Sequence, residues 1–268
     1  MKEGGGIIDK IRNEHVRVGK LDIHYLTGGQ GVPLIIIHGG GGGASGWQKN
    51  VRELSKNYRV YVPDLPGFGH SQPMGDDVSM SKFVQFVEDF SQAIGLKRFY
   101  LAGHSIGGGI ALQYALRFPD KVEKLVLVDS MCLGEEIAPW IRFLSLPAFC
   151  RSIGRAALAI TKFVGWLFGL FFAHIEFINP LPQVKIDVGE IVTTFKGQTT
   201  VLLNRLSDLL MPTLLVWGAR DNIVPVSQAY AASQVIPDCQ LHVFSNCGHS
   251  AYRENIEEFS QLLTRFFG

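Results

Sequence analysis

Short apolar runs recur along the chain, and each ends at a turn or at a polar residue. They cover residues 34–38, 60–64, 99–105, 124–130, 213–221 and 241–249. Unbroken runs of Ile, Val and Leu are typical of strands that are buried on both faces of a parallel sheet. The pattern therefore predicts that each run is a strand of such a sheet.

Helical spacing separates these runs. Residues 80–96 place five apolar side chains on one face before Gly95, a second helix is expected over 107–118, and a third closes the chain over 256–267. Strands that alternate with helices predict an α/β fold, a mostly parallel sheet with helices on both faces. Residues 16–18 and 23–26 alternate around a Gly-Lys pair, which predicts an antiparallel hairpin at the sheet edge.

One region breaks this rhythm. Residues 133–210 contain no clean strand and several prolines. We interpret this region as a helical cap inserted into one core, which divides the chain into a first core part (1–132), the cap (133–210) and a second core part (211–268).

Within the cap, residues 156–175 carry a single charge, Lys162, among many large apolar side chains. A membrane span needs about 20 apolar residues. The strand pattern resumes downstream, however, and a span would put the two halves of one sheet on opposite sides of a membrane. A buried cap helix is therefore favoured, and a helix that lies on a lipid surface stays open. Four basic residues suit an anionic lipid surface, an acidic substrate group or plain solvent: Arg142, Arg151, Arg155 and Lys162.

Composition narrows the classes of function. The 268 residues include 25 Lys or Arg and 24 Asp or Glu, a net charge of +1. Such a balance gives no long-range attraction for nucleic acid. The four cysteines lack the paired spacing of a zinc site, and we interpret them as free thiols of a cytoplasmic protein. The first residues show no apolar segment of a secretory signal.

The segment 103–107 reads Gly-His-Ser-Ile-Gly and fits the G-x-S-x-G pattern. In that pattern a serine lies on a sharp turn between a strand and a helix, and larger flanking residues would collide there. The predicted strand and helix on either side supply this context. Ser105 is therefore the candidate nucleophile.

A serine hydroxyl needs a base, and the expected order along the chain is serine, acid, histidine. Asp221 and His249 both follow predicted parallel strands, at the edge where α/β sheets hold their sites. His249 would accept the proton of Ser105, and Asp221 would orient the imidazole. The alternatives are a loop histidine, an Asp221 that caps the next helix, and Asp129 as the acid.

A developing oxyanion needs two backbone N–H donors. Ile106 supplies one, as the residue after the nucleophile. The other is expected from the loop after residues 34–37, where five consecutive glycines follow His38. A phosphate-binding loop is the alternative, but no Lys-Ser or Lys-Thr follows the glycines.

Taken together, these motifs resemble the α/β-hydrolases over nearly the whole chain. The matching segments are His38–Gly40, Asp64–Ser71, the Ser105 turn, Trp217–Asp221 and Gly248–His249. The resemblance implies an eight-stranded sheet, a cap at 133–210 and no cofactor. Relatives that use an aspartate nucleophile are disfavoured by the serine.

Two segments also resemble the meta-cleavage-product hydrolases, which split carbon–carbon bonds: residues 38–47 and 241–249. That match makes Gly40 the second oxyanion donor. The chain departs from this subfamily at His104, where Asn is usual, and at Ser250, where Trp is usual. The subfamily also uses a cap arginine, for which Arg142, Arg151 and Arg155 are candidates.

We therefore expect a serine hydrolase that forms an acyl-enzyme on a carboxylic ester with a lipophilic or aromatic group. The expected pocket residues are His38, Gly39, Trp140 and Trp166. The alternatives are a carbon–carbon hydrolase of ring-cleavage products, a lipid hydrolase at a membrane surface, and a non-catalytic ligand receptor. The expected partner is a small lipophilic molecule, with weak contact to a membrane through the cap.

Overall fold

The computed structural model describes residues 11–75, 78–142 and 197–268. Its eight strands form one sheet in the order β1-β2-β4-β3-β5-β6-β7-β8. Their bounds are β1 Arg12–Val18, β2 Leu21–Gly28, β3 Pro33–Ile37, β4 Arg59–Pro63, β5 Phe99–His104, β6 Val122–Val128, β7 Thr213–Gly218 and β8 Cys239–Phe244. β2 pairs antiparallel with both neighbours, and every pair from β4 to β8 is parallel. The predicted mostly parallel sheet is confirmed.

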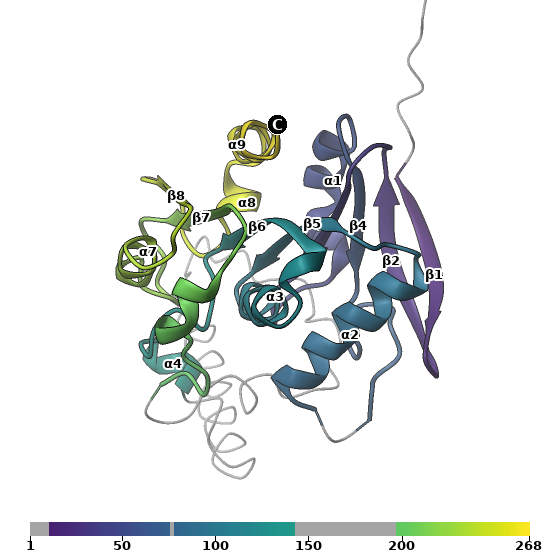
Figure 1. The fold of residues 1–268 in the computed structure, drawn as a ribbon, viewed down its shortest axis with the longest axis horizontal. Helices are drawn as coiled ribbons and strands as arrows, with labels where there is room; N and C mark the ends of the chain where they lie inside the picture. Colours follow the sequence, from purple (N-terminus) through teal and green to yellow (C-terminus); the bar gives the residue numbers. More distant parts are fainter. Residues whose placement is uncertain (1–10, 76–77, 143–196) are drawn as a thin grey trace, which may run out of the picture.

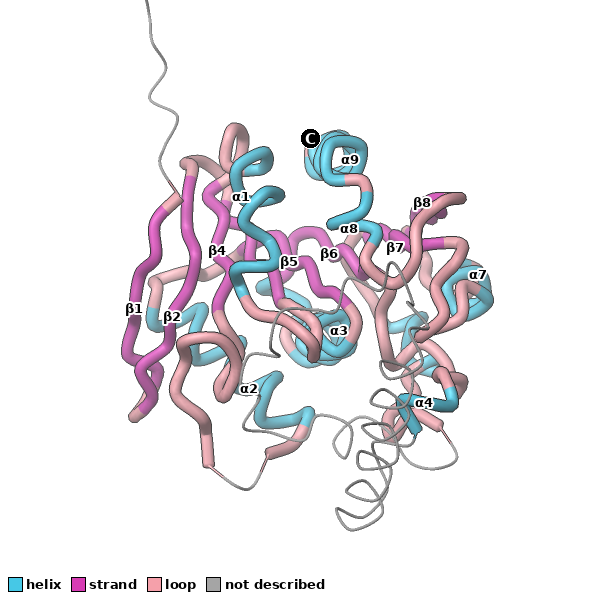
Figure 2. The backbone as a smooth tube through the Cα atoms, turned by 180° about the vertical axis from the view of Figure 1, so that it is seen from behind, coloured by secondary structure: helices cyan, strands magenta, loops and turns pink. Residues whose placement is uncertain are grey.

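Helices cover both faces of the sheet (Figure 1). On one face lie α1 (Gln48–Leu54), α8 (Ala251–Glu254) and α9 (Ile256–Phe267). On the other lie α2 (Met80–Ala93), α3 (Ile106–Arg117) and α7 (Ser227–Ser233). Figure 2 shows the same two layers from behind. The shorter elements are α4 (Pro139–Arg142) and the 3-10 turns Ala44–Trp47, Pro119–Lys121 and Leu203–Asp208.

The two faces explain why the strands are apolar throughout. Leu34 and Ile36 of β3 pack into the cluster that contains α1 and α9 residues, whereas Ile35 and Ile37 pack into the cluster under α2 and α3. Side chains alternate between the two faces along a strand, so a strand covered on both sides must be apolar at every position. This is the pattern from which the strands were predicted.

The strands end before the apolar runs do. β7 stops at Gly218 and β8 at Phe244, although the runs extend to residues 221 and 249. Backbone turns replace the ladder there, since the N–H of Asp221 donates to the carbonyl of Gly218 (3.1 Å) and that of Cys247 to Phe244 (3.4 Å). Asp221 and His249 therefore lie in loops at the carboxyl edge of the sheet.

The hairpin at the sheet edge is also confirmed. Val18 pairs with Leu21, and the turn between them contains Gly19 with φ of +59°. A glycine takes this left-handed conformation without the cost that a side chain would add.

Most of the predicted cap, residues 143–196, lies outside the described residues. Its two ends are held together beside the sheet. The Gln198 side-chain oxygen accepts from the N–H of Cys132 (2.7 Å), and its amide donates to the carbonyl of Glu136 (3.1 Å). Gln198 therefore joins the described segments on either side of residues 143–196, and the division into core and cap stays a prediction.

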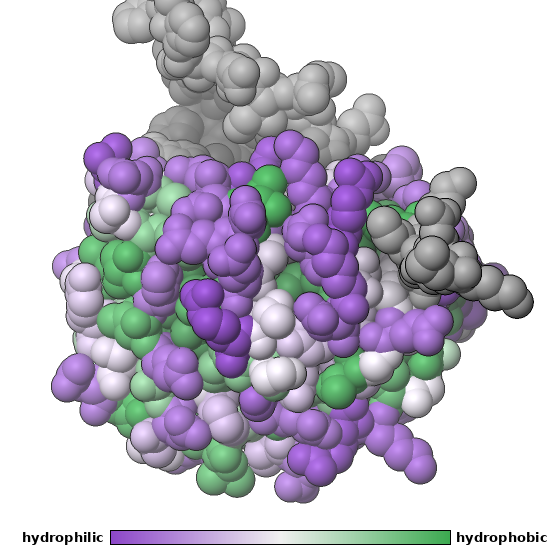
Figure 3. All heavy atoms as spheres, turned by 90° about the horizontal axis from the view of Figure 1, so that it is seen from above, coloured by the Kyte–Doolittle hydropathy of each residue, from purple (hydrophilic) through white to green (hydrophobic). Residues whose placement is uncertain are grey.

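The described helices include none that is both long enough and apolar enough to cross a membrane. The apolar segment 156–175 lies outside the described residues. Seen from the side of α1 and α9, the surface is largely hydrophilic, with apolar residues in small separate groups (Figure 3).

Candidate active site

Ser105 lies at the turn between β5 and α3, with φ of 54° and ψ of −120°. A Cβ at Gly103 would come within 2.2 Å of the Gly107 carbonyl oxygen, and one at Gly107 within 2.3 Å of the Ile37 carbonyl oxygen. Contacts of this kind leave room only for glycine. The two glycines of the motif thus permit the sharp turn that presents the Ser105 hydroxyl.

The structure brings the three candidate residues together. His249 Nε2 lies 2.9 Å from Ser105 Oγ, and His249 Nδ1 lies 2.8 Å from Asp221 Oδ2. An ionised carboxylate only accepts, so Nδ1 carries the proton and Nε2 is free to accept from the serine hydroxyl. The Asp221 side chain is fully buried and that of His249 is 13% exposed.

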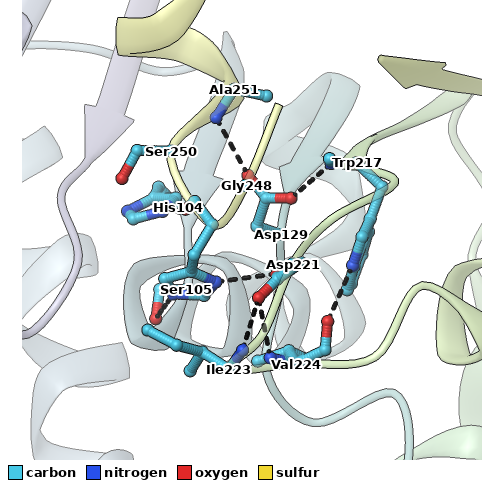
Figure 4. A network of polar contacts seen from close by, with 12 residues as sticks. His104, Ser105, Asp129, Trp217, Asp221, Ile223, Val224, Gly248, Ser250 and Ala251 are labelled. Atoms are coloured by element: carbon cyan, nitrogen blue, oxygen red, sulfur yellow. Dashed lines mark hydrogen bonds and ion pairs between the residues drawn. The ribbon is translucent and has the colours of Figure 1, made fainter. Parts of the chain in front are cut away.

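Asp221 is itself held by backbone. Its Oδ1 accepts from the N–H of Ile223 (2.7 Å) and of Val224 (3.0 Å), while the Trp217 indole donates to the Val224 carbonyl (3.0 Å). Figure 4 shows this turn beneath Ser105. α7 begins later, at Ser227, so Asp221 does not cap that helix.

Asp129, the rival acid, binds other partners. Its carboxylate accepts from the N–H of Gly218 (2.8 Å) and of Ala251 (3.3 Å), as the dashed lines of Figure 4 mark. Burial, and then the neighbouring Asp221 carboxylate, raise the pKa of Asp129 well above its usual range. Asp129 therefore fastens the segment after His249 to the end of β7.

The glycine loop after β3 lies against the nucleophile. A Cβ at Gly39 would come within 2.6 Å of His104 Nδ1 and 3.2 Å of the Ser105 Cβ. Among the described residues, no hydrogen bond uses the N–H of Gly40 or of Ile106. Neither N–H group is therefore taken up by another hydrogen bond of the described residues.

His38 supports this loop from within the protein. Its Nδ1 donates to the Gly39 carbonyl (2.8 Å), its Nε2 accepts from the N–H of Leu65 (2.9 Å), and the residue is 1% exposed. Burial lowers the pKa of His38, so the ring stays neutral as these bonds require. Both ring nitrogens are therefore used within the loop, and the place of His38 in the substrate pocket stays a prediction. The Trp140 side chain and Trp166 lie outside the described residues.

Asp64 holds the far end of the same loop. Its Oδ1 accepts from the N–H of Ala44 (2.6 Å) and its Oδ2 from His24 Nδ1 (2.7 Å), in a pair whose side chains are 3% and 6% exposed. Sequence reasoning cited Asp64 only as part of a motif. Its position at the end of an apolar run, just before a glycine turn, was the available signal.

No group of His, Cys, Asp and Glu side chains in the described part of the chain could hold a metal ion. The arrangement places a serine hydroxyl against an imidazole that is itself bonded to a carboxylate, which is the geometry that nucleophilic catalysis by serine needs.

Comparison with known proteins agrees with this architecture. The profile of the alpha/beta hydrolase fold family matches residues 32–153 and 161–256. The chain belongs to this family.

The chain is similar to hydrolases of more than one kind. A 2-hydroxy-6-oxononadienedioate/2-hydroxy-6-oxononatrienedioate hydrolase from a Pseudomonas species is 29% identical over 258 residues, 91% of each chain. The crystal structure of a bacterial membrane phospholipase A is 28% identical, with a TM-score of 0.71 over 96% of this chain and 86% of that one. A meta-cleavage product hydrolase from Pseudomonas fluorescens IP01, 23% identical with a TM-score of 0.74 over 98% of both chains, shares the fold. The family and its hydrolase neighbours are those that the sequence motifs resemble.

Proposed function

We propose that this α/β-hydrolase is a serine hydrolase that cleaves carboxylic esters through an acyl-enzyme. The observation that carries the proposal is the pair of bonds on one imidazole: His249 meets the Ser105 hydroxyl at 2.9 Å and the Asp221 carboxylate at 2.8 Å. A serine becomes a nucleophile when such a base is in reach and is itself oriented by an acid.

In the proposed reaction Ser105 Oγ attacks the ester carbonyl carbon while His249 Nε2 takes the hydroxyl proton. The N–H groups of Gly40 and Ile106 then donate to the oxyanion. His249 returns the proton to the alcohol as it leaves. A water molecule, deprotonated by the same imidazole, then attacks the acyl carbon; the bond to Ser105 breaks, the acid is released and His249 returns the proton to Ser105 Oγ. Each oxyanion donor lowers the barrier by about 3 kcal/mol.

The substrate class rests on the cap. Its sequence is rich in large apolar residues, and pockets are lined mainly by apolar and aromatic side chains. We propose a small lipophilic ester with an aromatic or medium-chain acyl group as the substrate.

Carbon–carbon hydrolysis is the second candidate. It is favoured by the similarity to hydrolases of ring-cleavage products, including one from Burkholderia cepacia at 28% identity over 91% of this chain. The similarity to a membrane phospholipase A favours a third, lipid hydrolysis at a membrane surface.

The deciding experiment compares kcat/KM of the purified protein on three substrates: a medium-chain p-nitrophenyl ester, a 2-hydroxy-6-oxo-dienoate and a phospholipid in vesicles. We expect the ester to be turned over fastest. A faster dienoate reaction would replace the ester proposal with carbon–carbon hydrolysis, and a faster vesicle reaction would replace it with lipid hydrolysis.

The control is Ser105→Ala, which removes only the nucleophilic oxygen. It should abolish turnover of the preferred substrate while the protein stays folded. Full activity in this variant would contradict a serine mechanism on any of the three substrates. Tight binding of a ligand by the unaltered protein, without turnover, would indicate a receptor.

A further inference from the structure

A buried imidazole lies beside the candidate site and has no part in the proposed reaction. His104 is the last residue of β5, directly before Ser105, and is 6% exposed. In the view of Figure 4 it lies between Ser105 and Ser250. The charge of a buried histidine and the direction of its hydrogen bonds follow from its partners.

One ring nitrogen is assigned by its partner. His104 Nε2 lies 2.6 Å from the carbonyl oxygen of His249. A carbonyl has no proton to give, so Nε2 must be the nitrogen that carries one. His104 therefore donates to the main chain of the residue whose side chain would be the general base.

The other ring nitrogen of His104 forms no hydrogen bond within the described structure. His104 Nδ1 is buried and has no hydrogen-bond partner in the described structure, and the backbone of Gly39 packs directly against it. Burial, together with the nearby His249, lowers the pKa of His104 well below its usual range, which keeps the ring neutral. Nδ1 is buried and Nε2 already donates to the His249 carbonyl, so we assign His104 no contact with substrate.

Aromatic contacts fix the ring between these two partners. Its centroid is 5.0 Å from that of His249 and 4.8 Å from that of Tyr252, which stacks on Trp47 at 3.8 Å. Asn50 in α1 donates to the Tyr252 carbonyl (2.9 Å). The ring of His104 thus contacts the His249 backbone, the glycine loop and the stacked side chains of Tyr252 and Trp47.

We propose that His104 is a positioning residue, whose Nε2–H bond to the His249 carbonyl and packing against Gly39 set the base and the oxyanion loop around Ser105. This inference rests on the proposed serine mechanism. Small displacements of reacting groups cost large factors in rate, so the effect should fall on kcat and leave KM nearly unchanged.

The test uses two substitutions of similar length. Gln places an amide N–H near the position of Nε2, whereas Met fills the space without a donor. We expect His104→Gln to keep kcat within about threefold of the unaltered protein and His104→Met to lose about tenfold or more, with KM within about threefold in both. His242→Gln, on β8, is the matched control and should leave kcat unchanged.

A fluorophosphonate probe separates this inference from the proposed function. The probe phosphonylates an activated serine and releases fluoride, so its rate reports the Ser105–His249 pair without substrate turnover. If the unaltered protein is not labelled at Ser105, the serine mechanism itself fails. If it is labelled and His104→Met matches it in labelling rate and kcat, the role of His104 is wrong and the serine mechanism stands.

Folding is checked for each variant by its melting temperature. If His104→Met does not fold, the Gln variant decides alone. Retention of kcat in folded His104→Gln supports the donor role, and a loss of about tenfold or more in that variant overturns it.

Discussion

Asp129 and Asp221 follow adjacent strands, yet only the Asp221 carboxylate meets the His249 ring. Asp221 Oδ2 is 2.8 Å from His249 Nδ1, whereas the Asp129 oxygens bind the N–H groups of Gly218 and Ala251. The two acids therefore act on different parts of one loop. Asp221 orients the side chain of His249, and Asp129 anchors the backbone two residues later.

This difference predicts opposite results for the same substitution. Asp221→Asn places an amide against Nδ1, which disfavours the tautomer that leaves Nε2 free, so kcat should fall by about 10³ to 10⁴. Asp129→Asn should lower kcat by less than about tenfold, because it leaves the Asp221 bond in place. Steady-state kinetics on the preferred ester measures both. Equal losses in the two variants would assign the acid's role to both carboxylates.

Asp129 should also give a distinct pH dependence of stability. Its pKa is raised in the folded state, mainly by burial, so the folded protein holds this proton more tightly than the unfolded chain. The stabilisation is complete below the ordinary range of an Asp carboxyl, about pH 4, and declines as the pH rises through the folded pKa. Asn does not titrate and lacks this dependence.

The measurement is the free energy of unfolding of the unaltered protein and of Asp129→Asn across this pH range. We expect the unaltered protein to lose stability relative to the variant as the pH rises. The slope of that difference is the readout, since a constant offset only reflects how well the amide fits. If the unaltered protein instead gained stability relative to Asp129→Asn as the pH rises, the ionised carboxylate would be favoured in the fold.

The tight turn at the nucleophile predicts a strong contrast between glycines. Gly107→Ala would bring a Cβ within 2.3 Å of backbone oxygen, whereas a Cβ at Gly42 would meet nothing within 4 Å. We expect Gly107→Ala to cost more than about 3 kcal/mol or to prevent folding, and Gly42→Ala to change stability by less than about 0.5 kcal/mol. Urea denaturation of the two variants compares them. Similar stability in both would show that the turn can open to admit a methyl group.

The fold and the meeting of Ser105, Asp221 and His249 were predictable because each leaves a local sequence pattern. Strands covered on both faces must be apolar at every position, and this gave the six parallel strands. The glycines around Ser105 mark a turn that excludes side chains. Asp221 and His249 follow from the order of strands, because carboxyl ends of parallel strands meet at one edge.

The supporting residues could not be predicted in the same way. The ring of His38 forms hydrogen bonds with the backbone of Gly39 and Leu65, a pairing that only the folded loop creates. His104 meets the carbonyl of a residue 145 positions later in the chain. Contacts between residues so far apart in the sequence leave no periodic signal along the chain.

Two histidine–aspartate pairs near the first strands should differ in how much they stabilise the fold. His24 and Asp64 meet at 2.7 Å with side chains 6% and 3% exposed, and His15 and Asp22 meet at 3.0 Å with 51% and 47% exposed. Asp64→Ala leaves several buried groups without a hydrogen-bond partner, so it should lower the free energy of unfolding by about 3 to 5 kcal/mol. Asp22→Ala should cost less than about 1 kcal/mol. Denaturant unfolding at one pH measures both, and comparable losses would show that burial does not set the difference.

The last prediction concerns the backbone of the nucleophile. Ser105 has φ of 54° and ψ of −120°, a conformation that favours glycine and costs a residue with a side chain about 1 to 3 kcal/mol. Ser105→Ala keeps this strain, because it keeps the Cβ, whereas Ser105→Gly releases it. Glycine in turn gains more freedom in the unfolded chain, which costs about 0.5 to 1 kcal/mol.

The release should exceed that cost, so we expect Ser105→Gly to be more stable than Ser105→Ala by about 1 kcal/mol, with both variants inactive. Thermal or urea unfolding of the pair measures the difference directly, since neither carries a nucleophile and the two differ only in the Cβ at this position. If Ser105→Gly were the less stable of the two, the turn would hold no strain at the nucleophile. The exposure of the hydroxyl would then depend on the flanking glycines alone.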